Sequence, residues 1–455
     1  MALSIGYKQA ISYVKSLDVY GSVLGLDNMK ALADELENPE SGLKFIHVTG
    51  TNGKGSVSAY ISNILIKAGY KVGTYNSPAV ISDIDQFRIN MKMIKKKLYA
   101  EAIELVKDAC ERLAIDKGIH PTRFEVETMA AFVAFYIEKC DIVVLETGLG
   151  GKDDATNIVT NTLLHVFTHI SMDHAAVLGD SLQKIAENKS GIIKSSSPTV
   201  ICARECSTEE SRASLNVILN KCEQFDSNAY IVSDENISKV RIKKNKLIFD
   251  YTGENNALKK LKLKMRGAYQ PLNAVTAIKA IEVLNDVGYN ISEESIKKGL
   301  KKTEIPFRFE RIEYNDKVDI ILDGAHNPDG AKQFVKSLEL NYPDRDFIFI
   351  TGIFKDKEYD KISSVFAGMA LKIYAIQNEK SVRSLDKDVL ADTLRKYNKN
   401  VFVSDTICSA VSQAIDDAKV TISANATHPI VCCIGSLSWL NEAKTEILKL
   451  KEKDK

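Results

Sequence analysis

The chain has 455 residues, of which 45% are hydrophobic and 27% are charged, a composition typical of a globular protein with two or three domains of roughly 150 residues each. The 61 lysines and arginines are balanced by 60 acidic residues, so the net charge favours neither nucleic-acid nor membrane binding. The longest apolar run, Met129–Ile137, is too short to span a bilayer, and the N-terminal stretch lacks a signal-peptide core. The eight cysteines include no Cys-x-x-Cys pair, so we expect buried thiols in a reducing cytoplasm rather than a zinc or redox site.

Short apolar runs alternate with amphipathic helical patterns along most of the chain. The predicted strands are Phe45–Val48, Ile142–Leu145, Leu163–Ile170, Val200–Cys202, Asp319–Leu322, Phe347–Ile350, Lys372–Ile376 and Pro429–Ile434. Buried parallel strands have near-continuous apolar sequences, so this alternation predicts an α/β fold with a mostly parallel sheet. Residues 205–265 are more polar and contain short alternating stretches, which indicate an antiparallel excursion.

A basic, proline-containing stretch at residues 297–310, KKGLKKTEIPFRFE, separates two series of strands and helices. A new strand–loop–helix series begins after it. We therefore expect a domain boundary near residue 303, which divides the chain into residues 1–302 and 303–455.

The first predicted strand leads into GTNGKGS and then into a helical pattern. A glycine-rich turn between a strand and a helix directs backbone N–H groups at an anion, and the helix dipole adds to the attraction. Lys54 would supply a charge to the outer phosphates. The common phosphate loop has glycine five residues before its second glycine and a hydroxyl directly after the lysine, whereas this chain has Val48 and Gly55 there. A glycine-rich turn with a solvated lysine is the alternative. The loop predicts phosphate binding but not the reaction.

Acidic and histidine side chains follow the next strands. The stretch TRFEVETMAAFVAFYIEKC begins with Thr122 and Glu125 in capping-box spacing, and the strand after it ends on Glu146. Phosphate-loop enzymes hold magnesium with a carboxylate in this position. Without the phosphate loop beside it, Glu146 would be interpreted as an ordinary acidic residue at the end of a strand. Asp173 and His174 follow the third strand. Because ligands collect at the carboxyl ends of parallel strands, His174 becomes a metal-ligand candidate if it converges with Glu146.

A set of motifs spans nearly the whole chain, from about Tyr7 to about Leu440. In order, they read HVTGTNGKGSV, NSP, ETGLGGKDDATN, SMDHAAVLGDSLQKIAENKSGIIK, YQPLNA, FRFE, LDGAHNPDG, TGIFKDKEYDK and GSLSW. Together they resemble the folylpolyglutamate synthase/dihydrofolate synthase family of the Mur ligase superfamily. The resemblance explains the unusual loop, because the folate branch of these ligases carries a glycine after the lysine, as Gly55 does here.

The resemblance implies an N-terminal Mur-ligase-type P-loop ATPase domain and a smaller C-terminal Rossmann-like α/β domain that binds glutamate. The implied reaction is ATP-dependent addition of L-glutamate to a folate (tetrahydrofolate polyglutamylation), to dihydropteroate, or to both, through an acyl phosphate. The implied partners are these small molecules, with no nucleic acid or membrane, and the protein would be a monomer. The alternatives are a Mur-type ligase with a non-folate acceptor acid, a nucleotide-binding module without chemistry, and a phosphate-loop kinase or motor.

The residues that the resemblance assigns to nucleotide and metal come from several motifs. The ATP phosphate loop would consist of Gly50, Thr51, Asn52, Gly53, Lys54, Gly55 and Ser56. One or two Mg²⁺ ions would be held by Ser77, Glu146 and His174. Lys189 matches a lysine that is carbamylated in this superfamily and supports the metal site, and Asn273 matches an asparagine on the adenine side.

The resemblance also assigns residues in the C-terminal part. Arg308 matches the arginine that reaches the ATP phosphates from the domain junction, and Asp323 and His326 match residues that face the nucleotide and the incoming amino acid. The residues implied in catalysis are therefore Lys54, Lys189, Arg308 and His326.

The chain departs from the family pattern mainly in the region that shapes the acceptor pocket. Asp85 and Gln86 stand where a Glu-Arg pair is usual, and either Arg88 or Lys152 could restore the lost charge. Tyr269–Gln270 stands where the dipeptide HQ is usual, and Phe307 where a glycine is common.

Overall fold

The computed structural model describes residues 5–21, 23, 25–204, 208–254, 256–315, 318–425 and 428–454. The chain forms two compact units. The first consists of Met1–Lys239, Phe249–Lys262 and Pro271–Thr303, and the second of Val240–Ile248, Leu263–Gln270 and Glu304–Lys455. The chain crosses between the units several times, the last time between Thr303 and Glu304, whereas we expected a single break. The assignment of ATP binding to residues 1–302 and glutamate binding to residues 303–455 stays a prediction.

The first unit contains an eight-stranded sheet in the order β4-β3-β2-β5-β1-β6-β7-β8. Its strands are β1 (Phe45–Thr49), β2 (Val72–Tyr75), β3 (Phe87–Ile89), β4 (Lys92–Met93), β5 (Ile142–Glu146), β6 (Thr162–Phe167), β7 (Thr199–Cys202) and β8 (Ala229–Val232). Neighbours from β2 to β8 are parallel, and β3 and β4 add an antiparallel edge. The parallel sheet confirms the predicted α/β fold and brings the ends of β1, β5 and β6 to one edge.

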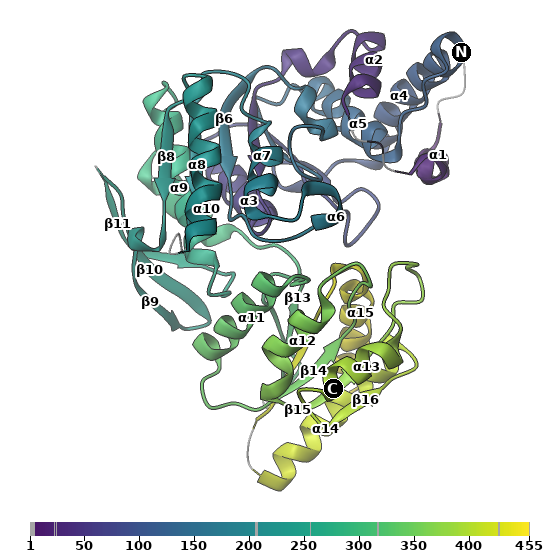
Figure 1. Ribbon diagram of the computed structural model, residues 1–455, viewed down its shortest axis with the longest axis vertical. Helices are drawn as coiled ribbons and strands as arrows, with labels where there is room; N and C mark the ends of the chain where they lie inside the picture. Colours follow the sequence, from purple (N-terminus) through teal and green to yellow (C-terminus); the bar gives the residue numbers. More distant parts are fainter. Residues whose placement is uncertain are drawn as a thin grey trace. The chain divides into compact units, whose positions relative to one another are not determined.

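Helices cover this sheet (Figure 1). They are α1 (Tyr7–Ser16), α2 (Asp27–Glu35), α3 (Lys54–Lys67), α4 (Lys96–Lys117), α5 (Arg123–Ile137), α6 (Ala175–Leu178), α7 (Leu182–Ser190), α8 (Glu209–Gln224), α9 (Gln270–Asp286) and α10 (Glu293–Lys302). The predicted capping box of α5 is present, since Glu125 N donates to Thr122 Oγ1 and Thr122 N donates to Glu125 Oε2. α7 packs against α8, and α3 against α10.

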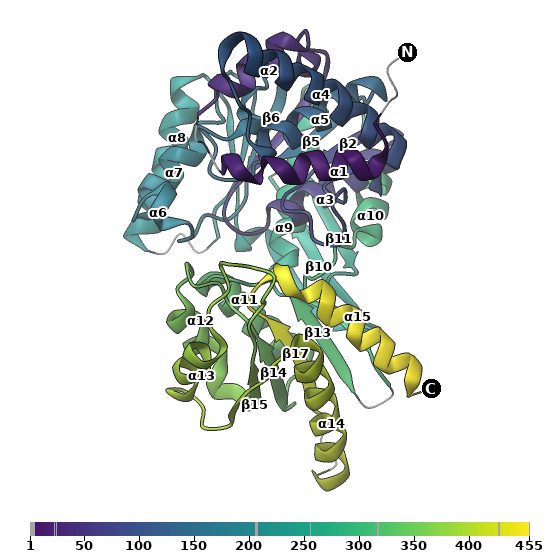
Figure 2. The ribbon, with the colours of Figure 1, turned by 90° about the vertical axis from the view of Figure 1, so that its right-hand side faces the viewer.

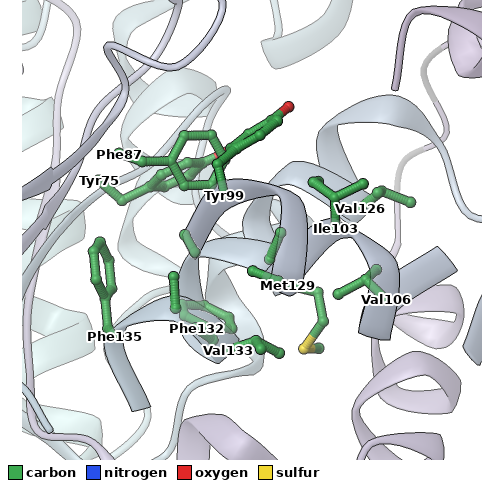
Figure 3. Packing of buried hydrophobic residues seen from close by; sticks show 14 of the residues in the cluster. Tyr75, Phe87, Tyr99, Ile103, Val106, Val126, Met129, Phe132, Val133 and Phe135 are labelled. Carbon is green, nitrogen blue, oxygen red and sulfur yellow. The ribbon is translucent and has the colours of Figure 1, made fainter. Parts of the chain in front are cut away.

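Aromatic and aliphatic side chains of α4, α5 and the sheet form one apolar core (Figure 3). Phe87 is fully buried, and its ring packs edge-to-face with those of Tyr75 and Tyr99, with ring centroids 5.5 and 5.3 Å apart. Met129 and Phe132 of α5 belong to the same cluster. This packing anchors α5, whose N-terminus lies beside the loop after β5: a Cβ on Gly148 would lie 2.4 Å from Cζ of Phe124.

The predicted antiparallel excursion over residues 205–265 is wrong in its first half. Residues Glu209–Gln224 form α8, and β8 extends the main sheet in parallel with β7. The amphipathic spacing of Leu215, Ile218 and Cys222 pairs α8 with α7, and this tertiary contact outweighs the polar composition. The rest forms a three-stranded sheet in the order β11-β10-β9, with β9 (Ile237–Lys243), β10 (Lys246–Thr252) and β11 (Ala257–Leu263).

The C-terminal unit contains a six-stranded sheet in the order β12-β13-β17-β14-β15-β16. The strands are β12 (Glu310–Glu313), β13 (Asp319–Asp323), β14 (Phe347–Thr351), β15 (Ala370–Ala375), β16 (Val401–Val403) and β17 (Ile430–Ile434). All neighbours are parallel except the edge strand β12. The helices are α11 (Pro328–Asn341), α12 (Tyr359–Phe366), α13 (Lys387–Arg395), α14 (Ile407–Asn425) and α15 (Leu437–Lys453), and α14 packs against α15 (Figure 2). This doubly wound sheet confirms the expected Rossmann-like architecture.

The cysteines within the described residues are free thiols, and all of them except the half-buried Cys408 are buried. Cys206 lies outside the described residues. Over the part of the chain that the structure describes, no helix is both long enough and apolar enough to cross a membrane.

Candidate active site

The loop between β1 and α3 has the predicted strand–loop–helix geometry. Gly50 and Gly53 have φ of 144° and 97°, values that a residue with a Cβ rarely adopts, so glycine permits the turn. The backbone amides of Thr51 and Asn52 donate to the carbonyl oxygen of His169, at 2.9 and 3.2 Å, which ties the loop to the segment after β6. The first intrahelical bond of α3 runs from Val57 N to Gly53 O. The amides of its first turn therefore have no acceptor within the helix, the arrangement that binds phosphate.

Two lysines direct their ammonium groups at one carbonyl oxygen of this loop. Lys189 Nζ donates to Gly50 O at 2.8 Å, and Lys54 Nζ donates to the same oxygen at 3.2 Å. Lys189 lies near the end of α7 and is 3% exposed. Burial, and then the charge of Lys54, lower the pKa of Lys189 to about 7, while Asp154 and Asp173 oppose the shift. Near neutral pH, Lys189 is therefore partly an uncharged amine.

Glu146 meets the same loop from the end of β5. A Cβ on Gly55 would lie 3.5 Å from Glu146 Oε2, so the residue after Lys54 is small where this carboxylate approaches. Asn76 Nδ2 donates to the same oxygen at 2.7 Å, which orients the carboxylate. Ser77, the predicted hydroxyl ligand, is the next residue after Asn76. Glu146 is 5% exposed, so it lies at the inner wall of the site.

Asn273 contacts the loop from α9. A Cβ on Gly53 would lie 2.6 Å from Asn273 Oδ1, so the absence of a side chain at position 53 makes room for this carboxamide. Asn273 is 7% exposed and lies within the first turns of α9. The structure therefore brings the predicted Asn273 to the phosphate loop.

His174 is connected to the loop through the segment after β6. Thr51 Oγ1 donates to Ser171 O at 2.9 Å, and Asn52 Nδ2 donates to Ser171 Oγ at 3.3 Å. His174, three residues further on, caps α6 with φ of 52°, and its Nε2 lies 3.9 Å from Asp173 Oδ1. The role of His174 beside Glu146 as a metal ligand stays a prediction.

The donor set fits Mg²⁺ better than a transition metal. Within the described ranges, no group of three or more histidine, cysteine, aspartate and glutamate side chains is arranged to hold a metal ion. Mg²⁺ is typically held by one or two carboxylates together with substrate phosphates and water. The carboxylate of Glu146 beside the phosphate loop meets this requirement, and the hydroxyl of Ser77 is a second oxygen donor on the adjacent segment.

The predicted residues of the C-terminal unit lie around Asp323, at the end of β13. Asp323 is 3% exposed, and its carboxylate accepts hydrogen bonds from Tyr269 Oη, Phe309 N and Ala325 N, each at 2.8 Å. Burial raises the pKa of Asp323, and Arg308 is foremost among the groups that lower it. Arg308 is half-buried, and its Nη1 would lie 3.1 Å from a Cβ on Gly324. The structure therefore brings Asp323 and Arg308 together.

His326 follows Asp323 by three residues. Its Nδ1 lies 2.8 Å from Gly324 O, a contact that orients the ring. Asn327, the next residue, caps α11 by accepting from Gly330 N at 2.8 Å. His326 is therefore held at the turn that joins β13 to α11.

Two departures from the family pattern have local structural explanations. Phe307 has φ of 59°, a left-handed conformation that glycine adopts most easily, yet its ring is fully buried. Gln86 is 4% exposed and hydrogen-bonds to Glu127, which also pairs with Arg123 at 3.2 Å. The cation beside position 86 therefore comes from α5. Restoration of the lost charge by Arg88 or Lys152 stays a prediction.

Asp85 stabilises the loop that precedes it. Its carboxylate accepts from Val80 N at 3.1 Å and from Ile81 N at 2.7 Å, and the side chain is buried. The aspartate at this position therefore has a local structural role.

The sequence analysis gave no site role to three residues that interact with the predicted ones. Asn76 bonds Glu146, Asp173 acts electrostatically on Lys189, and Tyr269 bonds Asp323. Each stands in or beside a motif quoted for the resemblance: NSP, SMDH and YQPLN. Adjacency to a motif could have singled them out, but their partners are far away in the sequence.

Comparison with known proteins gives two domain matches. The Mur ligase middle domain matches residues 48–281, about half of the chain, and the glutamate ligase domain of Mur ligases matches residues 307–436. The first match contains the phosphate loop, Glu146, Lys189 and Asn273, and the second contains Asp323.

Similar proteins match over nearly their full length. The dihydrofolate synthase/folylpolyglutamate synthase of Bacillus subtilis is 30% identical, and the match covers 97% of this chain and 99% of that protein. The dihydrofolate synthetase of Saccharomyces cerevisiae is 31% identical, with 92% of this chain and 96% of that protein covered. The crystal structure of folylpolyglutamate synthase from Thermotoga maritima has 32% identity and a TM-score of 0.78, with 97% of this chain and 96% of that chain covered.

Proposed function

The chain belongs to the dihydrofolate synthase/folylpolyglutamate synthase family of Mur ligases, and we propose that it uses ATP to join L-glutamate to a carboxylate of a folate, of dihydropteroate, or of both. The observation that carries the proposal is the convergence of Lys54, Lys189, Glu146 and Asn273, from four separate segments, on one phosphate loop. Such a loop positions a nucleotide, and the acidic side chain beside it suits a magnesium nucleotide.

The first step is phosphorylation of the acceptor. A carboxylate oxygen of the acceptor attacks the γ-phosphorus of ATP, ADP leaves, and an acyl phosphate forms. This step brings two anions together, so it needs cations and preorganised amides around the phosphates. In the N-terminal unit, Lys54 supplies a cation and the first turn of α3 supplies the backbone amides. We assign Arg308 as a further cation for the phosphates. Glu146, Ser77 and His174 would hold a Mg²⁺ ion, which would supply positive charge against that of the phosphates.

The second step forms the amide. The neutral amino group of glutamate attacks the acyl carbon, the carbon–oxygen bond to phosphate breaks, inorganic phosphate leaves, and the amine loses a proton. We assign His326 and Asp323 to the side of the incoming amino acid. The contact of His326 Nδ1 with Gly324 O fixes the orientation of the ring at this turn. Water must be excluded, because it would hydrolyse the acyl phosphate.

Lys189 is proposed to carry a carbamate in the active enzyme. Carbamylation needs an uncharged amine, which attacks CO₂ and releases a proton. The lowered pKa of Lys189, about 7, provides that amine at neutral pH. The product is an anion, which would relieve the repulsion between Lys189 and Lys54 and place negative charge where the cations of the nucleotide site bind.

The buried free thiols support a reducing compartment, and we assign the protein to the cytoplasm. The alternative is a Mur-type ligase with a different acceptor acid. The replacement of the usual Glu-Arg pair by Asp85 and Gln86 favours this alternative, since it changes the loop expected to contact the acceptor. The two domain matches agree with either acceptor, because both candidate enzymes are Mur-type ligases.

The test is glutamate-dependent phosphate release from ATP with a panel of acceptor acids, with products identified by mass. The panel contains dihydropteroate, a reduced monoglutamyl folate, and unrelated carboxylic acids. Addition of one glutamate to dihydropteroate or to the folate supports the proposal. Turnover only with an unrelated acid would replace it with the alternative ligase.

A further inference from the structure

One hydroxyl group connects the residue before α9 to the buried carboxylate at the end of β13. Tyr269 Oη donates to Asp323 Oδ2 at 2.8 Å, within the C-terminal unit. Tyr269 is the tyrosine that replaces the family's histidine in the dipeptide HQ. It plays no part in the steps described above.

The position of the Tyr269 ring is determined by its neighbours. A Cβ on Gly267 would lie 2.7 Å from both Cε1 and Cζ of Tyr269, so the ring lies directly over a glycine that leaves room for it. Ala268 N donates to Ser337 Oγ at 2.8 Å, and Asn341 Nδ2 donates to Arg266 O at 3.0 Å. The segment before Tyr269 is therefore held on α11 independently of the Tyr269 hydroxyl.

Asp323 also stabilises the backbone turn that carries Arg308. The same oxygen that accepts from Tyr269 accepts from the amide of Phe309, the residue after Arg308, and the other oxygen accepts from Ala325 N. Both neighbours of Arg308 are in the left-handed region, Phe307 with φ of 59° and Phe309 with φ of 53°. A turn with two such residues persists only when its surroundings hold it, and the carboxylate of Asp323 is one of those constraints.

We propose that Tyr269 is a positioning residue, which holds the carboxylate of Asp323 so that Asp323 keeps the Phe307–Phe309 turn, and with it the guanidinium of Arg308, in place for phosphoryl transfer. This inference rests on the proposed function. A buried carboxylate that loses a donor is destabilised as an anion. Without the hydroxyl, Asp323 binds a proton more readily, and its attraction for Arg308 weakens.

The test compares Tyr269→Phe with Tyr342→Phe. Tyr342 is a matched control, because its hydroxyl accepts from Arg266 Nη2 at 3.0 Å and so holds the same segment without contacting Asp323. We expect Tyr269→Phe to lower kcat by about tenfold or more, with the KM for glutamate changed less than kcat. Tyr342→Phe should keep the wild-type kcat. Tyr269→His, which retains a donor, should recover part of the loss.

Hydrogen–deuterium exchange provides a readout that does not depend on turnover. In Tyr269→Phe, the amides of Phe309 and Ala325 should exchange faster than in the wild type, whereas in Tyr342→Phe they should not. Unchanged exchange at both amides, or equal loss of kcat in both variants, would overturn the inference. If the wild type shows no glutamate-dependent phosphate release, the proposed function fails, and the exchange result still decides whether Tyr269 holds Asp323.

Discussion

The ammonium group of Lys189 donates to the carbonyl oxygen of Gly50, 2.8 Å away, although 139 residues separate the two in the sequence. Lys54, at the start of α3, donates to the same oxygen. Two like charges at one carbonyl are unfavourable in the absence of an anion. The low pKa of Lys189 comes first from its burial and then from this repulsion by Lys54. A nucleotide that draws Lys54 toward its phosphates would relieve the crowding.

We expect Lys54→Ala to abolish phosphate release while the protein stays folded. Lys54 is half-buried, and its ammonium group donates to the carbonyls of Gly50 and Thr51, so its removal costs little stability. Its charge is needed on the phosphates. Lys67→Ala, at the exposed far end of α3, is the control and should retain turnover. Near-normal phosphate release by Lys54→Ala would show that the phosphate-loop assignment is wrong.

Lys189 is expected to give a carbamate signal when the protein is incubated with ¹³C-bicarbonate and examined by ¹³C NMR. The signal should be absent in Lys189→Ala, which should also lose most activity, with partial recovery on addition of short carboxylates. Carbamylation at near-neutral pH follows from the pKa of about 7. A wild-type spectrum without the signal, with full activity, would contradict the carbamate.

The same pKa predicts how stability depends on pH when Lys189 is unmodified. Unfolded lysine holds its proton up to a pKa of about 10.4, whereas folded Lys189 releases it near 7. Between these values the unfolded state binds more protons, so the free energy of unfolding should rise with pH. Urea unfolding without CO₂ measures this rise, and Lys189→Met should reduce it.

Buried His165 predicts a loss of stability in acid. It pairs in register with His47 on the neighbouring strand, and burial lowers the pKa of His165 to about 4. Its folded pKa is below the unfolded value of about 6.5, so stability is present above 6.5 and is lost as pH falls toward 4. At pH 5 the loss from His165 alone is ~2 kcal/mol.

This acid effect is measured by urea unfolding at pH 7 and pH 5. His165→Gln should show a smaller difference between the two pH values than the wild type. His120→Gln, a change at an exposed histidine, is the control and should match the wild type. An undiminished pH effect in His165→Gln would assign the acid sensitivity to other groups.

Gln86→Arg tests the origin of acceptor preference. In the structure Gln86 bonds Glu127, which already pairs with Arg123, so an arginine at position 86 would add a second cation to one carboxylate. The surplus charge should favour the more anionic acceptor by about tenfold in affinity, the effect of one charge-assisted hydrogen bond. The measurement is kcat/KM for dihydropteroate and for a reduced monoglutamyl folate. Equal values in wild type and variant would show that position 86 does not affect acceptor choice.

Phe307→Gly is expected to destabilise the protein even though it removes an unfavourable backbone conformation. Release of the left-handed φ gains about 1–2 kcal/mol, whereas loss of a fully buried phenyl ring costs about 3–5 kcal/mol. The ring also lies under Lys444 Nζ, 5.5 Å from its centroid. Urea unfolding should therefore show a net loss of about 1–4 kcal/mol. A more stable variant would mean that backbone strain outweighs burial here.

The local features of this protein were determined by its sequence. The eight predicted strands are present within a few residues of their expected bounds, and so are the capping box of Thr122 and the glycine-rich loop before Lys54. These features depend on apolar runs, hydrogen bonds between near neighbours and backbone freedom at glycine, all of which operate over a few residues. The family motifs then predicted the residues of the phosphate loop.

Only the tertiary structure decided which distant side chains share an environment. Nothing near Lys189 in the sequence predicts that its ammonium is buried beside Lys54, and a surface lysine would have been the natural interpretation without the family motifs. The pairing of α8 with α7, the bond from Tyr269 to Asp323 and the contact of Gln86 with Glu127 all join segments far apart in the chain. Burial and charge depend on everything that packs around a group, so a pKa such as that of Lys189 follows from the assembled fold and from no local pattern.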